Sequence, residues 1–153
     1  MRLGHVCIIV KDMRRSLEFY RDAMGLQVII DDLLPNDEMF LTRDLETCTL
    51  EPGGRFRNLV LTDDEGSSLE LHEWFYPVTK ESPPEHLRYR TTGIKEVAWN
   101  VPDLDEVVKK LAEKGFAPRT PIWTYRTMGV ETRSVLYFDP DGVTVQFVEL
   151  PRA

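Results

Sequence analysis

The chain has 153 residues, which suits one ordinary domain or two small modules that share a core. Hydrophobic residues make up 42% and charged residues 29% of it, and the net charge of −7 argues against a nucleic-acid partner, since phosphate binding requires a basic surface. No apolar stretch approaches the roughly 20 residues that cross a bilayer, and Lys11 and Asp12 follow the first apolar run at once. Two cysteines, Cys7 and Cys48, are too few for a disulfide scaffold. We therefore expect a cytoplasmic protein with no signal peptide and no membrane partner.

The first half of the chain predicts a strand, a helix and then three strands. Residues 4–10, "GHVCIIV", form an apolar run headed by His5, and a run rich in Val and Ile is typical of a strand. Asp12 is a natural N-cap for the following helix, and Gly25 stands where a helix commonly ends. The helix itself is indicated by apolar residues at i, i+4, i+7 and i+11: Met13, Leu17, Tyr20 and Met24.

The middle of the chain is less regular. Residues 32–55 indicate only a short helix around 37–48. The segment 63–73, "DDEGSSLELHE", predicts a tight turn followed by a strand. Residues 77–92 contain three prolines and read as a linker.

The second half repeats the first. The segment 101–118, "VPDLDEVVKKLAEKGFAP", matches residues 10–28, with Asp103 in the place of Asp12 and Gly115 in the place of Gly25. The segment 139–149, "DPDGVTVQFVE", matches "DDEGSSLELHE" in the same way. The sequence therefore predicts an α+β fold of two βαβββ modules, over 1–76 and 93–153, joined by a linker over 77–92. Such a repeat is also expected from duplication that serves stability alone.

Alternation along the strands predicts which side chains share a face. In the first strand Val6, Ile8 and Val10 form an aliphatic face for the helix, which leaves His5 and Cys7 on the other face. The same reasoning puts four side chains that can coordinate a metal on the faces away from the helices: His5, Glu70, Glu96 and Gln146. In the repeat His5 is equivalent to Glu96, and Glu70 to Gln146. Such residues are either solvated or line a pocket, and their recurrence in both halves favours a pocket. Buried carboxylates need a partner, which a divalent cation supplies.

Four segments covering nearly the whole chain resemble the vicinal oxygen chelate superfamily, which includes glyoxalase I, bleomycin-resistance proteins and extradiol dioxygenases. These segments are "HVCIIVKDMRRSLEFYRDAMGL", "SLELHEW", "EVAWNVPDLDEVVKKLAEKG" and "YFDPDGVTVQFVEL". The resemblance implies mixed sheets that curl around a concave metal site, with His5, Glu70, Glu96 and Gln146 as ligands. Glu96 stands where the family usually has histidine, and Gln146 where it usually has a carboxylate. One His, one Gln and two Glu are nevertheless the ligand inventory of some glyoxalase I enzymes.

Nitrogen and oxygen ligands suit a divalent transition metal: Zn, Ni, Co or Mn. The resemblance then implies a metal-dependent isomerase or lyase that abstracts a proton from a small α-oxo or α-hydroxy substrate and stabilises the enediolate. Glu70 and Glu96 are the candidate bases, and Glu70 is favoured because it lies in the clearer motif. Weaker candidates for substrate contact are His72, Trp123, Tyr125 and Arg126, for which a strand-end position or an aromatic ladder is the ordinary alternative.

Two other functions stay open. One is a non-catalytic small-molecule binding protein, which resembles the bleomycin-resistance proteins that keep this fold without a metal. The other is a dioxygenase with an atypical iron site, although the ligand set departs from two histidines and one carboxylate. A homodimer is expected, and the site forms either within one chain or across two.

Overall fold

In the computed structural model, residues 3–35, 49, 51–127 and 129–150 are described, and the chain divides into two compact units, 1–81 and 82–153. The predicted short helix around 37–48 and Cys48 lie outside the described residues. No helix among the described residues is long and apolar enough to cross a membrane.

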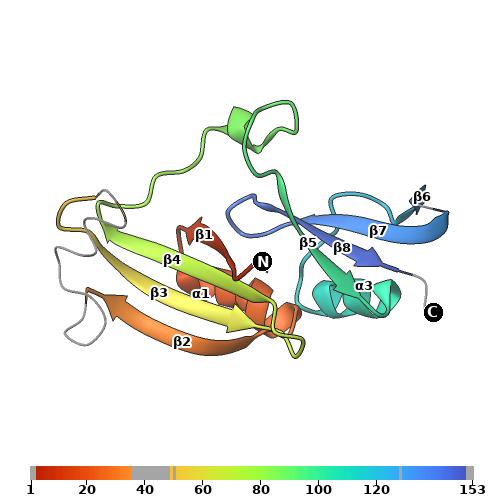
Figure 1. The fold of residues 1–153 in the computed structure, drawn as a ribbon, viewed down its shortest axis with the longest axis horizontal. Helices are drawn as coiled ribbons and strands as arrows, with labels where there is room; N and C mark the ends of the chain where they lie inside the picture. The colour runs from red at the N-terminus through yellow and green to blue at the C-terminus, as the bar shows by residue number, and fades with distance from the viewer. Residues whose placement is uncertain (1–2, 36–48, 50, 128, 151–153) are drawn as a thin grey trace. The chain divides into compact units, whose positions relative to one another are not determined.

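The first unit is a βαβββ module (Figure 1). Its elements are β1 (Val6–Val10), α1 (Met13–Leu17), the π-helical segment η1 (Glu18–Ala23), β2 (Gln27–Leu34), β3 (Arg55–Thr62) and β4 (Ser68–Tyr76). The strands form one four-stranded sheet in the order β1–β4–β3–β2, in which β1 runs parallel to β4 and the other pairs are antiparallel.

The second unit has the same topology. A short 3₁₀ helix, η2 (Pro84–Leu87), precedes β5 (Glu96–Val101), α3 (Leu104–Glu113), β6 (Trp123–Thr127), β7 (Val130–Phe138) and β8 (Thr144–Glu149). The sheet order is β5–β8–β7–β6, again with one parallel pair, β5 and β8. The predicted α+β fold of two βαβββ modules is therefore confirmed.

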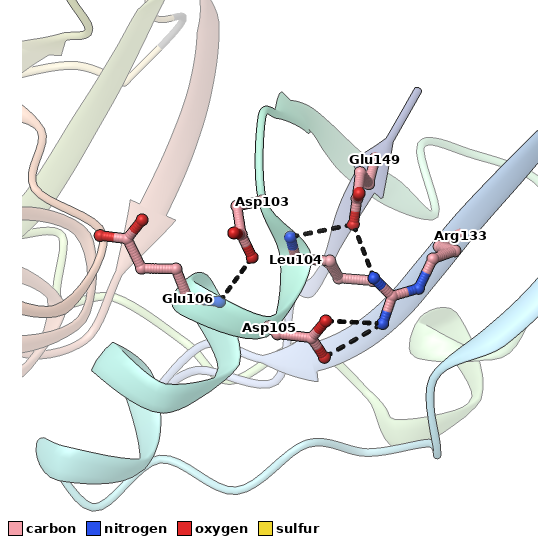
Figure 2. Close-up of polar contacts among 6 residues, drawn as sticks. All are labelled: Asp103, Leu104, Asp105, Glu106, Arg133 and Glu149. Atoms are coloured by element: carbon pink, nitrogen blue, oxygen red, sulfur yellow. Dashed lines mark hydrogen bonds and ion pairs between the residues drawn. The ribbon is translucent and has the colours of Figure 1, made fainter. Parts of the chain in front are cut away.

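The helices begin and end at the predicted residues. The Oδ1 atom of Asp12 accepts a hydrogen bond from the Arg15 amide at 3.2 Å, and that of Asp103 accepts one from the Glu106 amide at 2.9 Å (Figure 2). These carboxylates satisfy amides that have no partner within the helix. Gly115 follows α3 with φ of +84°, a left-handed conformation that a residue with a Cβ adopts only with strain.

One face of each sheet is covered by its helix and forms the apolar core. Figure 1 shows α1 against the first sheet and α3 against the second, and α1 contacts β4 while α3 contacts β8. The side chains at the centre of these faces are almost completely buried: Val10, Leu59, Leu61, Leu69 and Leu71 in the first unit, and Leu104, Leu111, Val135, Tyr137, Val145 and Phe147 in the second. The predicted alternation of faces is thus correct, and it leaves the opposite faces for other roles.

An arginine connects the start of α3 to the sheet of the second unit. Arg133 donates to both carboxylate oxygens of Asp105 at 2.9 and 3.0 Å, and its Nη1 donates to Oε2 of Glu149 at 3.0 Å (Figure 2). The same Glu149 oxygen accepts the Leu104 amide at 3.1 Å. The first helical turn is therefore attached to β7 and β8 by charged hydrogen bonds.

The equivalent arginine of the first unit makes a different connection. Arg57 donates to both oxygens of Asp31, each at 2.7 Å. That pair joins β3 to β2 within the sheet, whereas the Arg133 pairs join the sheet to a helix.

Replacing Arg133 with methionine should lower the free energy of unfolding by about 1 kcal/mol, because two ion pairs are lost while an apolar stem of similar length is kept. As a control, Lys110→Met removes only the exposed pair with Glu106 and should cost clearly less than the Arg133 substitution. Urea unfolding followed by circular dichroism, at low and high salt, measures both. Equal losses in the two variants, or an Arg133 effect that high salt does not reduce, would contradict this assignment.

Candidate metal and substrate site

The two units hold their candidate ligands in the same register. Val6 pairs with Leu69 in the first unit, and Val97 pairs with Val145 in the second. Since His5 precedes Val6 and Glu70 follows Leu69, these two side chains stand in the same relation as Glu96 and Gln146. The internal repeat seen in the sequence is therefore also a repeat of strand pairing, and each half carries one pair of polar side chains on the face away from its helix.

In the first unit this pair is in direct contact. Nε2 of His5 lies 3.2 Å from Oε2 of Glu70, and Nε2 of His72 lies 3.4 Å from the other oxygen, Oε1. The Glu70 and His72 side chains are only 20% and 15% exposed, so the carboxylate is largely removed from water. One carboxylate is thus flanked by two imidazoles, one from the residue that precedes β1 and one from β4.

The protonation of this cluster suits a cation. Burial lowers the pKa of His72 although Glu70 opposes that shift, so the imidazole is neutral at neutral pH. Its Nε2 is buried and has only the long, 3.4 Å contact with Glu70, with no well-formed hydrogen bond within the described part of the chain. A neutral imidazole with a free ring nitrogen beside a carboxylate is the donor set that a divalent transition metal takes. The residues present therefore fit the metal that the resemblance implies.

Cys7 joins the same cluster. It pairs with Glu70 in the register of β1 and β4, and the ligand atoms of Cys7, Glu70 and His72 all lie within 4.8 Å of one another. Burial first, and the Glu70 carboxylate second, raise the pKa of the Cys7 thiol to about 12. The thiol is therefore protonated at neutral pH, and Cys7 is a neutral, exposed side chain next to the site.

An aromatic wall adjoins the cluster along β3 and β4. The Phe56 ring lies 4.3 Å from the His72 ring and 4.5 Å from the Trp74 ring, measured between centroids. Leu34 from β2 packs on the same group. An apolar wall beside a few polar side chains is the usual composition of a small-molecule site.

In the second unit Glu96 accepts a hydrogen bond from the hydroxyl of Tyr89 at 2.5 Å. Burial and the neighbouring Glu96 carboxylate raise the pKa of Tyr89 to about 12, so Tyr89 remains a phenol that donates. Only one oxygen of Glu96, Oε2, takes part in this bond. Tyr89 belongs to the segment predicted as a linker and was not predicted to contact the site.

The side-chain amide of Gln146 is held in one orientation by a hydrogen bond to Ser134. Its Nε2 donates to Oγ of Ser134 at 2.7 Å, and that hydroxyl donates to the Phe147 carbonyl at 3.0 Å. Because the Ser134 proton is used on the carbonyl, the amide nitrogen must face Ser134, and the Oε1 atom points away as a ligand would require. No bond joins Gln146 to Glu96 among the described residues, and convergence of these two with His5 and Glu70 on one cation stays a prediction.

The predicted substrate residues of β6 lie on two faces. Trp123 pairs with Ser134 and Tyr125 with Thr132, so both share the Gln146 face. Arg126 pairs with Glu131 and lies on the opposite face, as the alternation of the strand requires. His72, the remaining candidate, lies in the metal-ligand cluster of the first unit.

Comparison with known proteins shows the family of the chain and its fold. The family model described as "Glyoxalase/Bleomycin resistance protein/Dioxygenase superfamily" matches residues 2–147. A Bacillus subtilis (strain 168) protein, "Uncharacterized protein YwkD", is 30% identical over 148 residues, which cover 96% of this chain and 95% of that one.

Solved structures show the same fold. A glyoxalase family protein from Bacillus cereus superposes with a TM-score of 0.80 at 18% identity, covering 99% of this chain and 95% of that one. A glyoxalase I mutant from Zea mays superposes with a TM-score of 0.64 at 18% identity, covering 96% of this chain and 44% of that one. With paired βαβββ units, polar pairs in matching register and a family model that spans almost all residues, the chain belongs to the glyoxalase/bleomycin resistance protein/dioxygenase superfamily.

Proposed function

We propose that the protein is a metal-dependent isomerase or lyase of the glyoxalase type, which abstracts a proton from a small α-oxo or α-hydroxy substrate. One observation carries the proposal: in the first unit a poorly exposed carboxylate, Glu70, lies between the Nε2 atoms of His5 and His72. A carboxylate with two such neighbours and a free imidazole nitrogen has the chemistry of a metal site rather than of a surface ion pair.

Three of the four predicted ligands would hold the ion, which is Zn, Ni, Co or Mn, while Glu96 serves as the base and His72 supports the Glu70 carboxylate. His5 and Glu70 supply an imidazole and a carboxylate from the first unit, and Gln146 supplies its Oε1 atom from the second unit of the same chain or of a partner chain. Three protein ligands leave coordination positions for substrate. When bound, the metal acts as a Lewis acid for the negative charge that develops on the substrate oxygen.

We assign the proton abstraction to Glu96. Both oxygens of Glu70 lie beside imidazoles, whereas Glu96 is held at one oxygen by the Tyr89 hydroxyl. The free oxygen of Glu96 can take a proton from the carbon next to the carbonyl, and Tyr89 fixes the direction of the carboxylate. This differs from the sequence-based preference for Glu70, which rested on the clearer motif alone.

The metal content of the purified protein tests the proposal. We expect about one transition-metal ion per chain by mass spectrometry, as a single catalytic centre requires. His5→Ala should weaken metal binding by more than the 10–100-fold that loss of a supporting residue typically costs, because a direct ligand is removed. The matched control is His86→Ala, since His86 is exposed in η2 and belongs to no cluster of candidate ligands in the described structure.

The same experiment, with activity assays, distinguishes the enzyme from the non-catalytic binding protein and the dioxygenase. Absence of metal in every preparation, with no uptake of Zn, Ni, Co or Mn, would leave the non-catalytic binding protein. Oxygen consumption with a catechol by iron-loaded protein would favour the dioxygenase. Activity on the glutathione–methylglyoxal hemithioacetal or on methylmalonyl-CoA would identify the isomerase or lyase.

A further inference from the structure

Arg119, between α3 and β6, is fixed above the face that carries Glu96. Its Cζ atom lies 4.2 Å from the centre of the Phe138 ring, and its Nη1 donates to Oγ1 of Thr144 at 3.2 Å. Its backbone amide donates to the Leu136 carbonyl at 2.7 Å. The residue is exposed, but its side chain is held by the ring contact and by the hydrogen bond to a buried hydroxyl.

The strand register puts this arginine next to the proposed base. Phe138 pairs with Thr144, and Thr144 pairs with Glu96, so the three residues occupy one row across β7, β8 and β5. Tyr89 closes the row, because its hydroxyl donates to Glu96. Two hydrogen-bonded pairs, Arg119 with Thr144 and Tyr89 with Glu96, therefore lie along one row of the sheet.

The Arg119 guanidinium is left with an unused edge. Arg14, Arg57 and Arg133 each face a carboxylate. Within the ranges that the structure describes, Arg119 faces none, and its Nε and Nη2 atoms have no acceptor. The ring contact with Phe138 does not neutralise the charge. Among the described residues Arg15 and Arg55 also have no ion pair, so what distinguishes Arg119 is its placement against the Phe138 ring and Thr144.

We propose that Arg119 binds an anionic group of the substrate with two oxygens, so that the substrate is an acid anion, such as an α-oxo or α-hydroxy acid, rather than a neutral carbonyl compound. The free edge of a guanidinium donates two parallel hydrogen bonds to such a group. With the anion held at Arg119, the neighbouring carbon is directed along the row toward Glu96. This assignment of substrate class rests on the proposed function, but the anion site itself does not need the metal.

The test uses the full-length protein after removal of metal with a chelator, so that binding through a metal cannot contribute. Lactate and lactamide form a matched pair that differs in the anionic group, and inorganic phosphate is the tetrahedral alternative. Ligand-observed NMR titrations measure their dissociation constants. We expect lactate to bind at least about 10-fold more tightly than lactamide, as charge-assisted hydrogen bonds require.

Arg119→Ala should weaken lactate binding by about 10–100-fold, and Arg119→Lys should weaken it less because the charge is kept and the fork is lost. Arg15→Ala removes the same charge from the exposed surface of α1 and should leave binding unchanged. Circular dichroism of each variant verifies the fold. Tighter binding of phosphate than of lactate, with the same dependence on Arg119, would support the anion site and identify a phosphate- or phosphonate-bearing substrate.

The proposal is overturned if lactate and lactamide bind equally, if Arg119→Ala binds lactate like the unmodified protein, or if Arg15→Ala loses binding to the same extent. Metal binding by the Arg119→Ala variant separates the two proposals. Normal metal uptake with no anion binding in the unmodified protein would remove the anion site alone. Anion binding that depends on Arg119 in a protein that takes up no metal would remove the proposed enzyme activity alone.

Discussion

Replacing Glu96 with glutamine should reduce the rate of α-proton exchange by about 10²–10⁴-fold, the range that general-base catalysis contributes. The amide keeps the shape of the carboxylate and still accepts the Tyr89 hydroxyl, but it cannot take a proton. The rate is measured by NMR in D₂O as deuterium incorporation into the methylglyoxal hemithioacetal or another active substrate, with metal-reconstituted protein. Metal content measured on the same sample should stay near that of the unmodified protein.

A matched control for this change is Glu113→Gln, which removes an equal charge from the exposed end of α3 and should leave the exchange rate unchanged. Retained exchange in Glu96→Gln would contradict the assignment of the base. If Glu70→Gln then abolished exchange while the metal was retained, Glu70 would be the base, as the sequence motif alone had favoured.

Replacing Leu71 with alanine should lower the free energy of unfolding by about 2–5 kcal/mol, the cost of a large cavity in a packed core. Leu71 is 0% exposed and lies in β4 between Ile8 of β1 and Leu59 of β3, so no neighbour can fill the space without moving a strand. Since domains are stable by only about 5–15 kcal/mol, a large part of the stability would be lost. Urea unfolding followed by circular dichroism measures the change.

The matched control is Leu33→Ala in the edge strand β2, where Leu33 is 51% exposed. That substitution creates no cavity and should change the free energy of unfolding by no more than about 0.5 kcal/mol. Similar losses in both variants would mean that the apolar face of the first sheet is not the packed core.

The fold was predictable because the first strand, the helix and the last strand of each module carried local signals and recurred in both halves. The Asp12 and Asp103 caps, the left-handed Gly115 and the alternation of side chains along β1 and β5 all act over a few residues. Alternation also separates Arg126 from Trp123 and Tyr125, so the two faces of this cluster are encoded in the sequence.

Two residues of the candidate site, Tyr89 and Arg119, could not be predicted from local sequence patterns. Tyr89 and Arg119 lie in irregular segments, after η2 and between α3 and β6, where no periodicity indicates the direction of a side chain. Their contacts with Glu96 and Thr144 arise only when β5, β8 and β7 have assembled side by side. The change from α-helix to π-helix at Glu18 is likewise not encoded by the apolar stripe, which continues through it.

The different partners of Arg57 and Arg133 have a consequence for how the halves respond to their surroundings. In the second half, ionic strength acts on the attachment of a helix, because the guanidinium contacts the first turn of α3. In the first half the equivalent arginine, Arg57, pairs with Asp31 of the neighbouring strand β2. The helix α1 therefore packs on its sheet chiefly through buried apolar side chains. The two modules share a topology but respond differently to salt. Screening by salt weakens the attachment of α3 to its sheet in the second module and the pairing of β2 with β3 in the first.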